Sequence, residues 1–336
     1  MSRPRSVRAH DRTATAALLL ALGSLLLGIA PRALALDPQL ATTQYVFDNW
    51  QIQQGLPQNS VESLARTPDG YLWLATHEGL VRFDGVRFSV FDRDNTPELR
   101  SRVMTKLHVD VAGRLWVGTR VGILIFENGR FHALRDAGVG DGYIRAITSD
   151  ADGRVWAGTD HALFEIDRGK VTRHDGAQGL HDSAIRALEI DRSGTLWVAT
   201  NVGGLYRRDG AFFHRVPLGR DAGADAVRAL FIDGDGRMWA GTEDGQVFQG
   251  SDGRFQPFAL APKLSAGISA ILRDRDGSLW IATTGAGALR WNGSTTAWFD
   301  MGERTSNDVR AMIEDPEGSL WLGTYGGGLE RLRDGK

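Results

Sequence analysis

One short motif recurs seven times in this chain, and this repetition limits the possible folds more than any other feature. The motif is typified by DGRVWAGT at 152–159, a turn sequence followed by a Trp and a closing Thr. A fixed period of this size indicates an architecture built from repeated units. The repeated tryptophans stand 40 to 43 residues apart, at Trp73, Trp116, Trp156, Trp197, Trp239, Trp280 and Trp321.

Each copy contains four short apolar segments separated by turns. In the fourth copy they are 185–190, 195–200, 204–207 and 211–216. Short runs rich in Val, Ile, Leu and aromatic residues, bounded by turns, predict strands. Asp-x-x-Gly sequences between the first two strands predict type I turns, and Asx-Gly dipeptides between the last two predict hairpins. Each copy is therefore predicted to form a four-stranded antiparallel sheet.

Radial stacking of the copies would cover both apolar faces of every sheet. The repeat thus predicts an all-β fold, a seven-bladed β-propeller over 36–336 with the tryptophans packed between blades. The seventh copy ends without a fourth strand, whereas the strand-like segment 43–50 precedes the first copy. We expect this segment to pair with 329–332 and complete the seventh blade, which removes an exposed sheet edge. The alternative is that 43–50 is a disordered leader.

The first 35 residues differ in kind from the rest. A basic start with four arginines precedes the apolar run 17–30, and Ala33-Leu34-Ala35 supplies small residues for cleavage. This pattern predicts a signal peptide at 1–35, cleaved near Ala35, and therefore a periplasmic protein; an uncleaved anchor is the alternative. The chain has no cysteine, which excludes disulfides and thiol chemistry. A net charge of −2 gives no reason to expect nucleic acid as a partner.

The copies resemble the two-component regulator propeller repeat. The resemblance rests on Asp-x-x-Gly-x-Leu-Trp-x-Gly/Ala-Thr followed by Gly-Leu and Arg, as in DGYLWLATHEGLVRFDG, and covers about 43–335. It implies an exported ligand sensor of a two-component or cyclic-di-GMP signalling system. In such sensors the propeller commonly precedes a second propeller, an immunoglobulin-like domain, a membrane helix and a histidine kinase or diguanylate cyclase. Because this chain ends after seven copies, we expect either a truncated sensor without its output domain or a binding protein with a membrane-bound signalling partner.

Local catalytic motifs are missing from the sequence. It contains neither HExxH nor GxSxG, so no metal, cofactor or catalytic residue is predicted. Two sets of variable positions remain as candidate ligand-binding residues. The first set follows the repeated Thr and comprises His77, Glu78, Arg120, Asp160, His161, Asn201, Glu243, Asp244, Thr284 and Tyr325. The second set lies near the start of each first strand and comprises Glu62, Met104, Arg145, Arg186, Arg228, Ser269 and Arg310.

The first set offers donors, acceptors and one aromatic face, which suits a polyhydroxylated or anionic small ligand such as an oligosaccharide. The four arginines of the second set could bind a carboxylate or phosphate in bidentate fashion. Alternatively, each arginine pairs with an acidic residue of a neighbouring blade. The preferred function is a non-catalytic, exported, ligand-binding sensor. The rival is an exported hydrolase or lyase acting on carbohydrate, for which Glu78, Asp160, Glu243 and Asp244 are candidate paired carboxylates.

Overall fold

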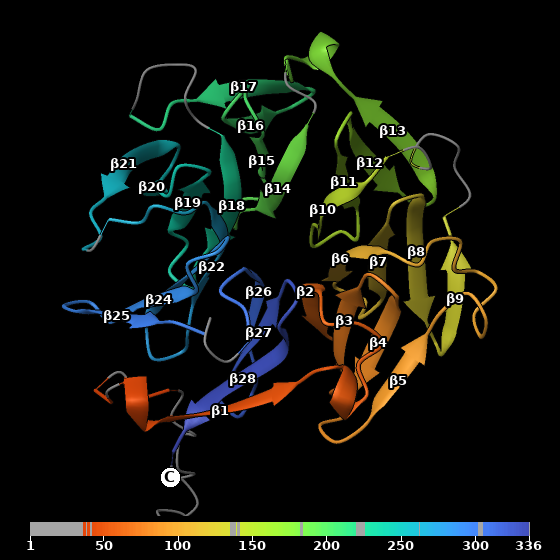
Figure 1. Cartoon of the computed structure of the whole chain (residues 1–336). Coiled ribbons are helices and arrows are strands. Elements are labelled where there is room, and N and C mark those ends of the chain that lie inside the picture. The colour runs from red at the N-terminus through yellow and green to blue at the C-terminus, as the bar shows by residue number, and fades with distance from the viewer. Residues whose placement is uncertain are drawn as a thin grey trace, which may run out of the picture. The chain divides into compact units, whose positions relative to one another are not determined.

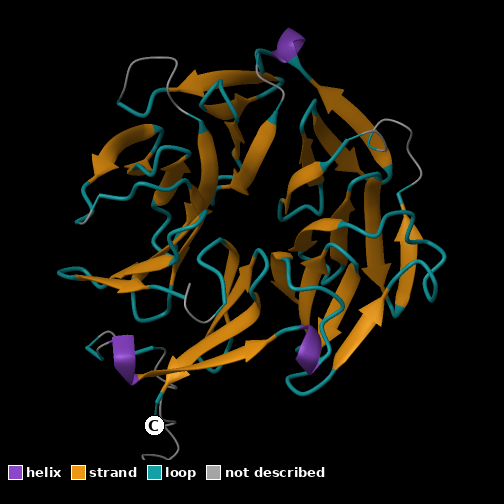
Figure 2. Cartoon of the chain, in the orientation of Figure 1, coloured by secondary structure: helices purple, strands orange, loops and turns teal. Residues whose placement is uncertain are grey.

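The computed structural model describes residues 36–37, 39–40, 42–134, 139, 142–181, 184–219, 226–261, 263–301 and 305–335. These residues form 28 strands and three short 3-10 helices, η1 (Thr42–Gln44), η2 (Ile52–Gln54) and η3 (Gly176–Gln178). The strands make seven four-stranded sheets arranged as the blades of a ring (Figures 1 and 2). The seven-bladed β-propeller is confirmed. The predicted signal peptide at 1–35 lies outside the described residues.

Blades 1 to 4 each use four consecutive strands. Blade 1 has β2 (Val61–Arg66), β3 (Leu72–Thr76), β4 (Gly79–Phe83) and β5 (Phe88–Phe91). Blade 2 has β6 (Met104–Val109), β7 (Leu115–Thr119), β8 (Gly122–Glu127) and β9 (Arg130–Ala133). Blade 3 has β10 (Ile144–Ser149), β11 (Val155–Thr159), β12 (Leu163–Asp167) and β13 (Lys170–His174). Blade 4 has β14 (Ile185–Ile190), β15 (Leu196–Thr200), β16 (Leu205–Asp209) and β17 (Phe212–Val216).

Blades 5 and 6 follow the same order, and blade 7 does not. Blade 5 has β18 (Val227–Ile232), β19 (Met238–Thr242), β20 (Val247–Ser251) and β21 (Arg254–Phe258). Blade 6 has β22 (Ile268–Arg273), β23 (Leu279–Thr283), β24 (Ala288–Trp291) and β25 (Thr296–Phe299). Blade 7 has β26 (Val309–Glu314), β27 (Leu320–Thr324), β28 (Gly328–Asp334) and, as its outermost strand, β1 (Tyr45–Trp50).

The ring closes as the strand count predicts. β1 pairs antiparallel with β28, from Tyr45 opposite Asp334 to Trp50 opposite Leu329 (Figure 1). The Asp48 carboxylate also accepts hydrogen bonds from Arg331, at 2.7 and 3.0 Å, and from Arg333, at 2.9 Å. The two ends of the chain segment that forms the ring are thus joined by a β-ladder and an ion-pair cluster.

The repeated Trp and the Asp that opens the preceding turn form one unit. In blade 5 the Asp233 carboxylate accepts from the backbone N–H groups of Asp235 and Arg237 and from the Trp239 indole, at 3.0, 2.9 and 3.1 Å. The Trp239 ring is 1% exposed and packs in one cluster with blade 6 residues, including Ile268 and Leu279. The prediction that the tryptophans pack between blades is confirmed, because Trp73 and Trp321 likewise cluster with the blade that follows.

Two small features of the repeat hold the blades close and fix the loops above them. A Cβ added to Gly158 would lie 2.3 Å from Cγ2 of Ile185 on the next blade, which explains the Gly at this position of blade 3. The Thr that follows is buried, and its hydroxyl donates to a backbone carbonyl at the far end of the next loop, as from Thr200 to Gly204 at 3.1 Å. The loops that carry the first candidate set therefore start from a fixed point.

Candidate functional site

The innermost strands of all seven blades surround a central channel. β2, β6, β10, β14, β18, β22 and β26 face the axis of the ring (Figure 1). Together they line a cavity of about 370 Å³. A cavity of this kind, lined by residues that are distant in sequence, is a typical location for a ligand-binding site.

Every innermost strand contains a β-bulge near its entrance to this cavity. In blade 4, Ile185 pairs with Thr200 and Ala187 pairs with Ala199, which leaves Arg186 as the extra residue. The same shift occurs in the other six blades. A bulge redirects one side chain out of the regular alternation. The bulge residues are Glu62, Thr105, Arg145, Arg186, Arg228, Ser269 and Arg310.

This set corrects one member of the second candidate set. Met104 is fully buried and pairs with Thr119, so it occupies the core position that precedes the bulge. Thr105 is the residue of blade 2 that matches the arginines. The sequence interpretation placed the start of this strand one residue too early, at Val103, which is also apolar, and therefore chose Met104 in place of Thr105.

The two candidate sets form one structure, because each bulge residue stands 15 positions before a loop residue of its own blade. Glu62 contacts His77 at 2.9 Å, and Arg228 contacts Glu243 at 2.5 Å. Arg145 binds both carboxylate oxygens of Asp160, at 2.8 and 3.2 Å. The arginines therefore pair within their own blades and not with neighbouring blades.

Arg186 differs from the other arginines in having a neutral partner. Its Nε and Nη2 both donate to Oδ1 of Asn201, at 2.9 and 2.7 Å. Burial lowers the pKa of Arg186, and the positive charges of Arg145 and Arg228 on the flanking blades lower it further. Three guanidinium groups on consecutive blades thus converge, and the middle one lacks a bonded carboxylate among the described residues.

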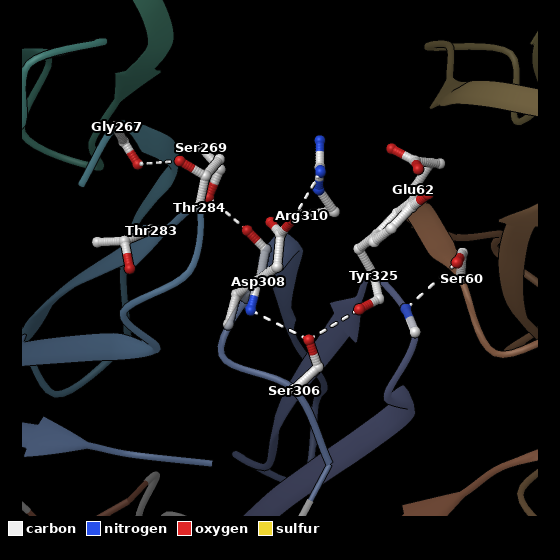
Figure 3. Close-up of polar contacts among 12 residues, drawn as sticks. Ser60, Glu62, Gly267, Ser269, Thr283, Thr284, Ser306, Asp308, Arg310 and Tyr325 are labelled. Carbon is white, nitrogen blue, oxygen red and sulfur yellow. Dashed lines mark hydrogen bonds and ion pairs between the residues drawn. The ribbon is translucent and has the colours of Figure 1, made fainter. Parts of the chain in front are cut away.

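The bulge residues and their loop partners surround the entrance to the cavity, here called the mouth. On the side of the mouth opposite Arg186, blade 7 carries an exposed aromatic ring. Tyr325 is 47% exposed, and its ring lies 5.0 Å from Arg310 and 5.8 Å edge-on from His77. Figure 3 shows the Tyr325 side chain between Arg310 and Glu62. Ser306 holds the Tyr325 backbone by donating to its carbonyl oxygen at 2.7 Å.

The Arg310 ion pair beside this ring is incompletely satisfied. Arg310 Nη2 donates to Oδ2 of Asp308 at 2.7 Å (Figure 3). Arg310 Nε and Asp308 Oδ1 are buried without a hydrogen-bond partner among the described residues. A buried polar atom without a partner costs about 1–3 kcal/mol. This cost at the mouth of a cavity favours a binding role over a purely structural one.

The other predicted residues of the first set have separate environments. Glu78 lies 3.6 Å from Arg102, and the Asp244 carboxylate accepts from Thr242 at 2.5 Å. His161 is exposed at its loop tip. Arg120 shares the face of Tyr143 with Arg145, at 5.7 and 3.9 Å from the ring. The sequence analysis missed Tyr143, which precedes β10 and carries no repeat signal of its own.

Two ionisable side chains lie deeper in the cavity, below the mouth. Lys106 of blade 2 and Glu189 of blade 4 both line it. Burial raises the pKa of Glu189 to about 7, against the opposing effect of Lys106. Burial also lowers the pKa of Lys106, against the charges of Glu189 and Glu62. At the matching position of the other six blades, Lys106 is replaced by Ser or Ala.

A scan against protein families finds the two-component regulator propeller repeat at six places, 55–78, 138–161, 179–202, 223–244, 263–285 and 304–326. Each match runs through the innermost strand and its neighbour to the loop at the mouth. The chain contains repeats of the two-component regulator propeller family. The copy around Trp116 is not among the six matches, and this is the copy that carries Lys106. A search of curated proteins finds no match.

Solved structures resemble the propeller at low sequence identity. A protein described as the extracellular domain of a hybrid two component system, BT3049 of B. thetaiotaomicron, superposes with a TM-score of 0.73 at 23% identity. The match covers 86% of this chain and 42% of that domain, so this regulator propeller spans well under half of it. A streptogramin B lyase superposes with a TM-score of 0.73 at 17% identity, covering 88% of this chain and 99% of the lyase. These similarities establish the fold.

The described residues contain neither a membrane-spanning helix nor a cluster of metal-ligating side chains. No helix among them is long and apolar enough to cross a membrane. Nor do three or more His, Asp or Glu side chains in the described part of the chain gather as a metal site.

Proposed function

We propose that this regulator propeller is an exported, non-catalytic sensor domain that binds a small molecule at the mouth of its central channel. The single observation that carries the proposal is the pairing of bulge and loop residues around the cavity. These side chains vary from blade to blade, whereas the strands that hold them repeat. A varied polar rim on a uniform rigid scaffold is how loops are used for recognition.

The chemistry of the mouth suits a ligand with hydroxyl or acidic groups. Tyr325 offers a ring face, and Arg310 and Asp308 have unsatisfied polar atoms beside it. On the other side, Arg145, Arg186 and Arg228 offer guanidinium donors. We propose the following ligand-contacting residues around this rim: His77, Glu78, Arg120, Asp160, His161, Asn201, Glu243, Asp244, Tyr325, Arg145, Arg186, Arg228 and Arg310.

The cellular part of the proposal is a periplasmic protein that passes its ligand state to a membrane-bound signalling partner or to output domains. The family and the extracellular sensor domains of similar fold support export. If 1–35 is a cleaved signal peptide, the mature protein begins at Leu36. Intact-mass measurement of the exported form tests this directly, and retention of residues 1–35 would contradict it.

Ligand binding is tested by thermal denaturation in the presence of oligosaccharides, uronates and amino acids. A ligand at 100 times its Kd stabilises the folded state by about 2.7 kcal/mol if it binds only that state. We expect Arg120→Ala and Tyr325→Ala to abolish the Tm rise while leaving the unliganded Tm close to that of the wild type, because both are at the rim. A Tm rise that survives both substitutions would place the site elsewhere.

A second candidate function is a lyase acting on carbohydrate. It is favoured by the His77–Glu62 pair, whose 2.9 Å contact beside Tyr325 forms a potential acid–base dyad at the cavity. The fold match to a whole lyase adds support. The carboxylates named from sequence fit less well, since Asp160 and Glu243 are each engaged by an arginine. Product formation from a carbohydrate panel, lost in His77→Ala, would favour the lyase over the sensor.

A further inference from the structure

The loop residue that stands 15 positions after each bulge residue can be compared from blade to blade. Where the bulge residue is Arg145 or Arg228, the loop supplies an acid, Asp160 or Glu243. Arg310 has its acid two residues earlier, at Asp308. Arg186 alone among these four has an amide, Asn201, as its bonded partner in the described part of the chain.

The amide of Asn201 holds the Arg186 guanidinium in place without neutralising it. Both donated bonds end on one oxygen atom, Oδ1, at 2.9 and 2.7 Å. The bond from a guanidinium to an amide is assisted by the charge of the donor alone, whereas a carboxylate adds the opposite charge and can accept two parallel N–H bonds. An incoming anionic group therefore gains more at Arg186 than at Arg145 or Arg228, where it must first displace an internal carboxylate.

The surroundings of Arg186 strengthen this preference. The flanking arginines and partial burial both act against its positive charge, as its lowered pKa reflects. Arg145 and Arg228 are already paired with Asp160 and Glu243, whose charges act on Arg186 in the opposite direction, so the positive charge of Arg186 is the one in this group of three without a bonded carboxylate in the described residues. An incoming anion is therefore attracted chiefly to Arg186. The cavity beneath carries Lys106 as a further cation, and the acids that act on Lys106 are Glu189, which burial keeps partly protonated near neutral pH, and Glu62, which contacts His77.

From this arrangement we propose that Arg186 is the anion-binding group of the site, and that the ligand carries a carboxylate or phosphate which docks on Arg186 between Arg145 and Arg228. This inference deepens the proposed function and rests on it. A guanidinium recognises both kinds of anion through paired N–H donors, so the shared chemistry is a planar or tetrahedral oxyanion. The rest of the ligand extends across the mouth toward Tyr325.

The sharpest test supplies the missing carboxylate internally. Asn201→Asp places a carboxylate beside Arg186, at the position from which Asp160 pairs with Arg145, and should therefore compete with any ligand anion. Asn292→Asp is the matched control, because it makes the same substitution in the outer hairpin of blade 6, where the amide oxygen of Asn292 accepts from the backbone N–H groups of Ser294 and Thr295. We expect Asn201→Asp to fold at least as stably as the wild type, since an ion pair replaces a bond from the guanidinium to a neutral amide.

Three probes are used: sodium glucuronate, glucose 1-phosphate and neutral glucose. Their binding is measured by thermal denaturation and by titration calorimetry, at constant ionic strength. At least one anionic probe should raise the Tm of the wild type in a saturable way while glucose does not. Asn201→Asp and Arg186→Gln should weaken that binding by about tenfold or more. Asn292→Asp should keep it. The two anionic arms decide between carboxylate and phosphate.

The outcomes separate this inference from the proposed function. Equal anion binding by wild type and Asn201→Asp overturns the assignment to Arg186. Binding of glucose alone, lost in Tyr325→Ala, also overturns it but leaves the sensor proposal standing. If no probe binds to the wild type, and the wider ligand screen also finds nothing that depends on the mouth, both proposals fail.

Discussion

The ionisable groups of the central channel make a quantitative prediction about stability and pH. Burial raises the pKa of Glu189 from its ordinary 4.5 to about 7. Between these values the folded protein keeps a proton that the unfolded chain has released. The contribution of Glu189 to stability must therefore fall as pH rises through this window, by about 1.4 kcal/mol per pH unit. From pH 5 to pH 8 the expected loss is about 2.5 kcal/mol.

The substitution Glu189→Gln removes this titration while nearly preserving the shape of the side chain. The free energy of unfolding of the wild type, minus that of the variant, should fall by about 2.5 kcal/mol between pH 5 and pH 8. Lys106 acts in the same direction, because loss of the opposing carboxylate lowers its pKa further. Urea denaturation followed by tryptophan fluorescence at each pH measures the difference.

His108 provides a control of opposite sign. It stands at the same position of blade 2 that Glu189 occupies in blade 4, and its ring contacts Ser149 at 2.7 Å. Burial lowers its pKa from 6.5 to about 4; Lys106 acts in the same direction and Asp110 opposes it. The unfolded chain therefore holds the extra proton, and stability rises with pH across this range. For His108→Gln, the same difference should rise by about 2 kcal/mol from pH 5 to pH 8.

The two results together can refute the reasoning. If the wild-type-minus-Glu189→Gln difference stays constant within about 0.5 kcal/mol over the range, Glu189 is solvated and ionised in the folded state. If both variants change the slope in the same direction, the side chains do not titrate independently through burial. A flat wild-type profile alone would not contradict the prediction, because the two contributions nearly cancel.

Three further predictions concern the construction of the ring. Gly158→Ala should cost about 1–3 kcal/mol through contact with Ile185, measured as a lower Tm, whereas Ala282→Gly at the same position of blade 6 should cost less. Asp233→Ala should destabilise the fold by about 3 kcal/mol, because the indole N–H of Trp239 and the N–H groups of the turn lose their acceptor; a Tm equal to that of the wild type would contradict this prediction. Deletion of 36–51 should lower the Tm and cause association through β28, seen by light scattering; an unchanged monomer would contradict the closure.

The fold could be predicted because the determinants are local and repeated seven times. A Trp six residues after an Asp, with Gly between them, defines a hairpin whose carboxylate bonds the indole, as Asp315 and Trp321 do at 2.7 Å. Closure by β1 followed from counting strands at the two ends. The turn Arg168-Gly169 lacks an Asx residue yet has positive φ at both positions, 49° and 82°, and it joins the paired strands β12 and β13 as the Asx-Gly turns do elsewhere.

The site was less predictable because it depends on register. The sequence identified both sets of variable positions but treated them as separate rings. Only the bulge brings Arg145 to Asp160 or Arg228 to Glu243, and a bulge has no residue signature in these strands. The recurring separation of 15 residues between the two sets was present in the sequence and would have indicated the pairing.

Departures from the repeat are therefore the most informative residues for function. Positions that serve packing recur, as the buried Thr200 and Thr324 do, since each blade presents the same contact to the next. A cation at Lys106, where the other blades carry Ser or Ala, is not required by packing and adds the cost of burying a charge. Asn201 also departs from the repeat, because two other blades have a carboxylate at this position and blade 4 has an amide. Both departures leave positive charge less compensated around one cavity, which is the pattern expected if an anionic ligand completes it.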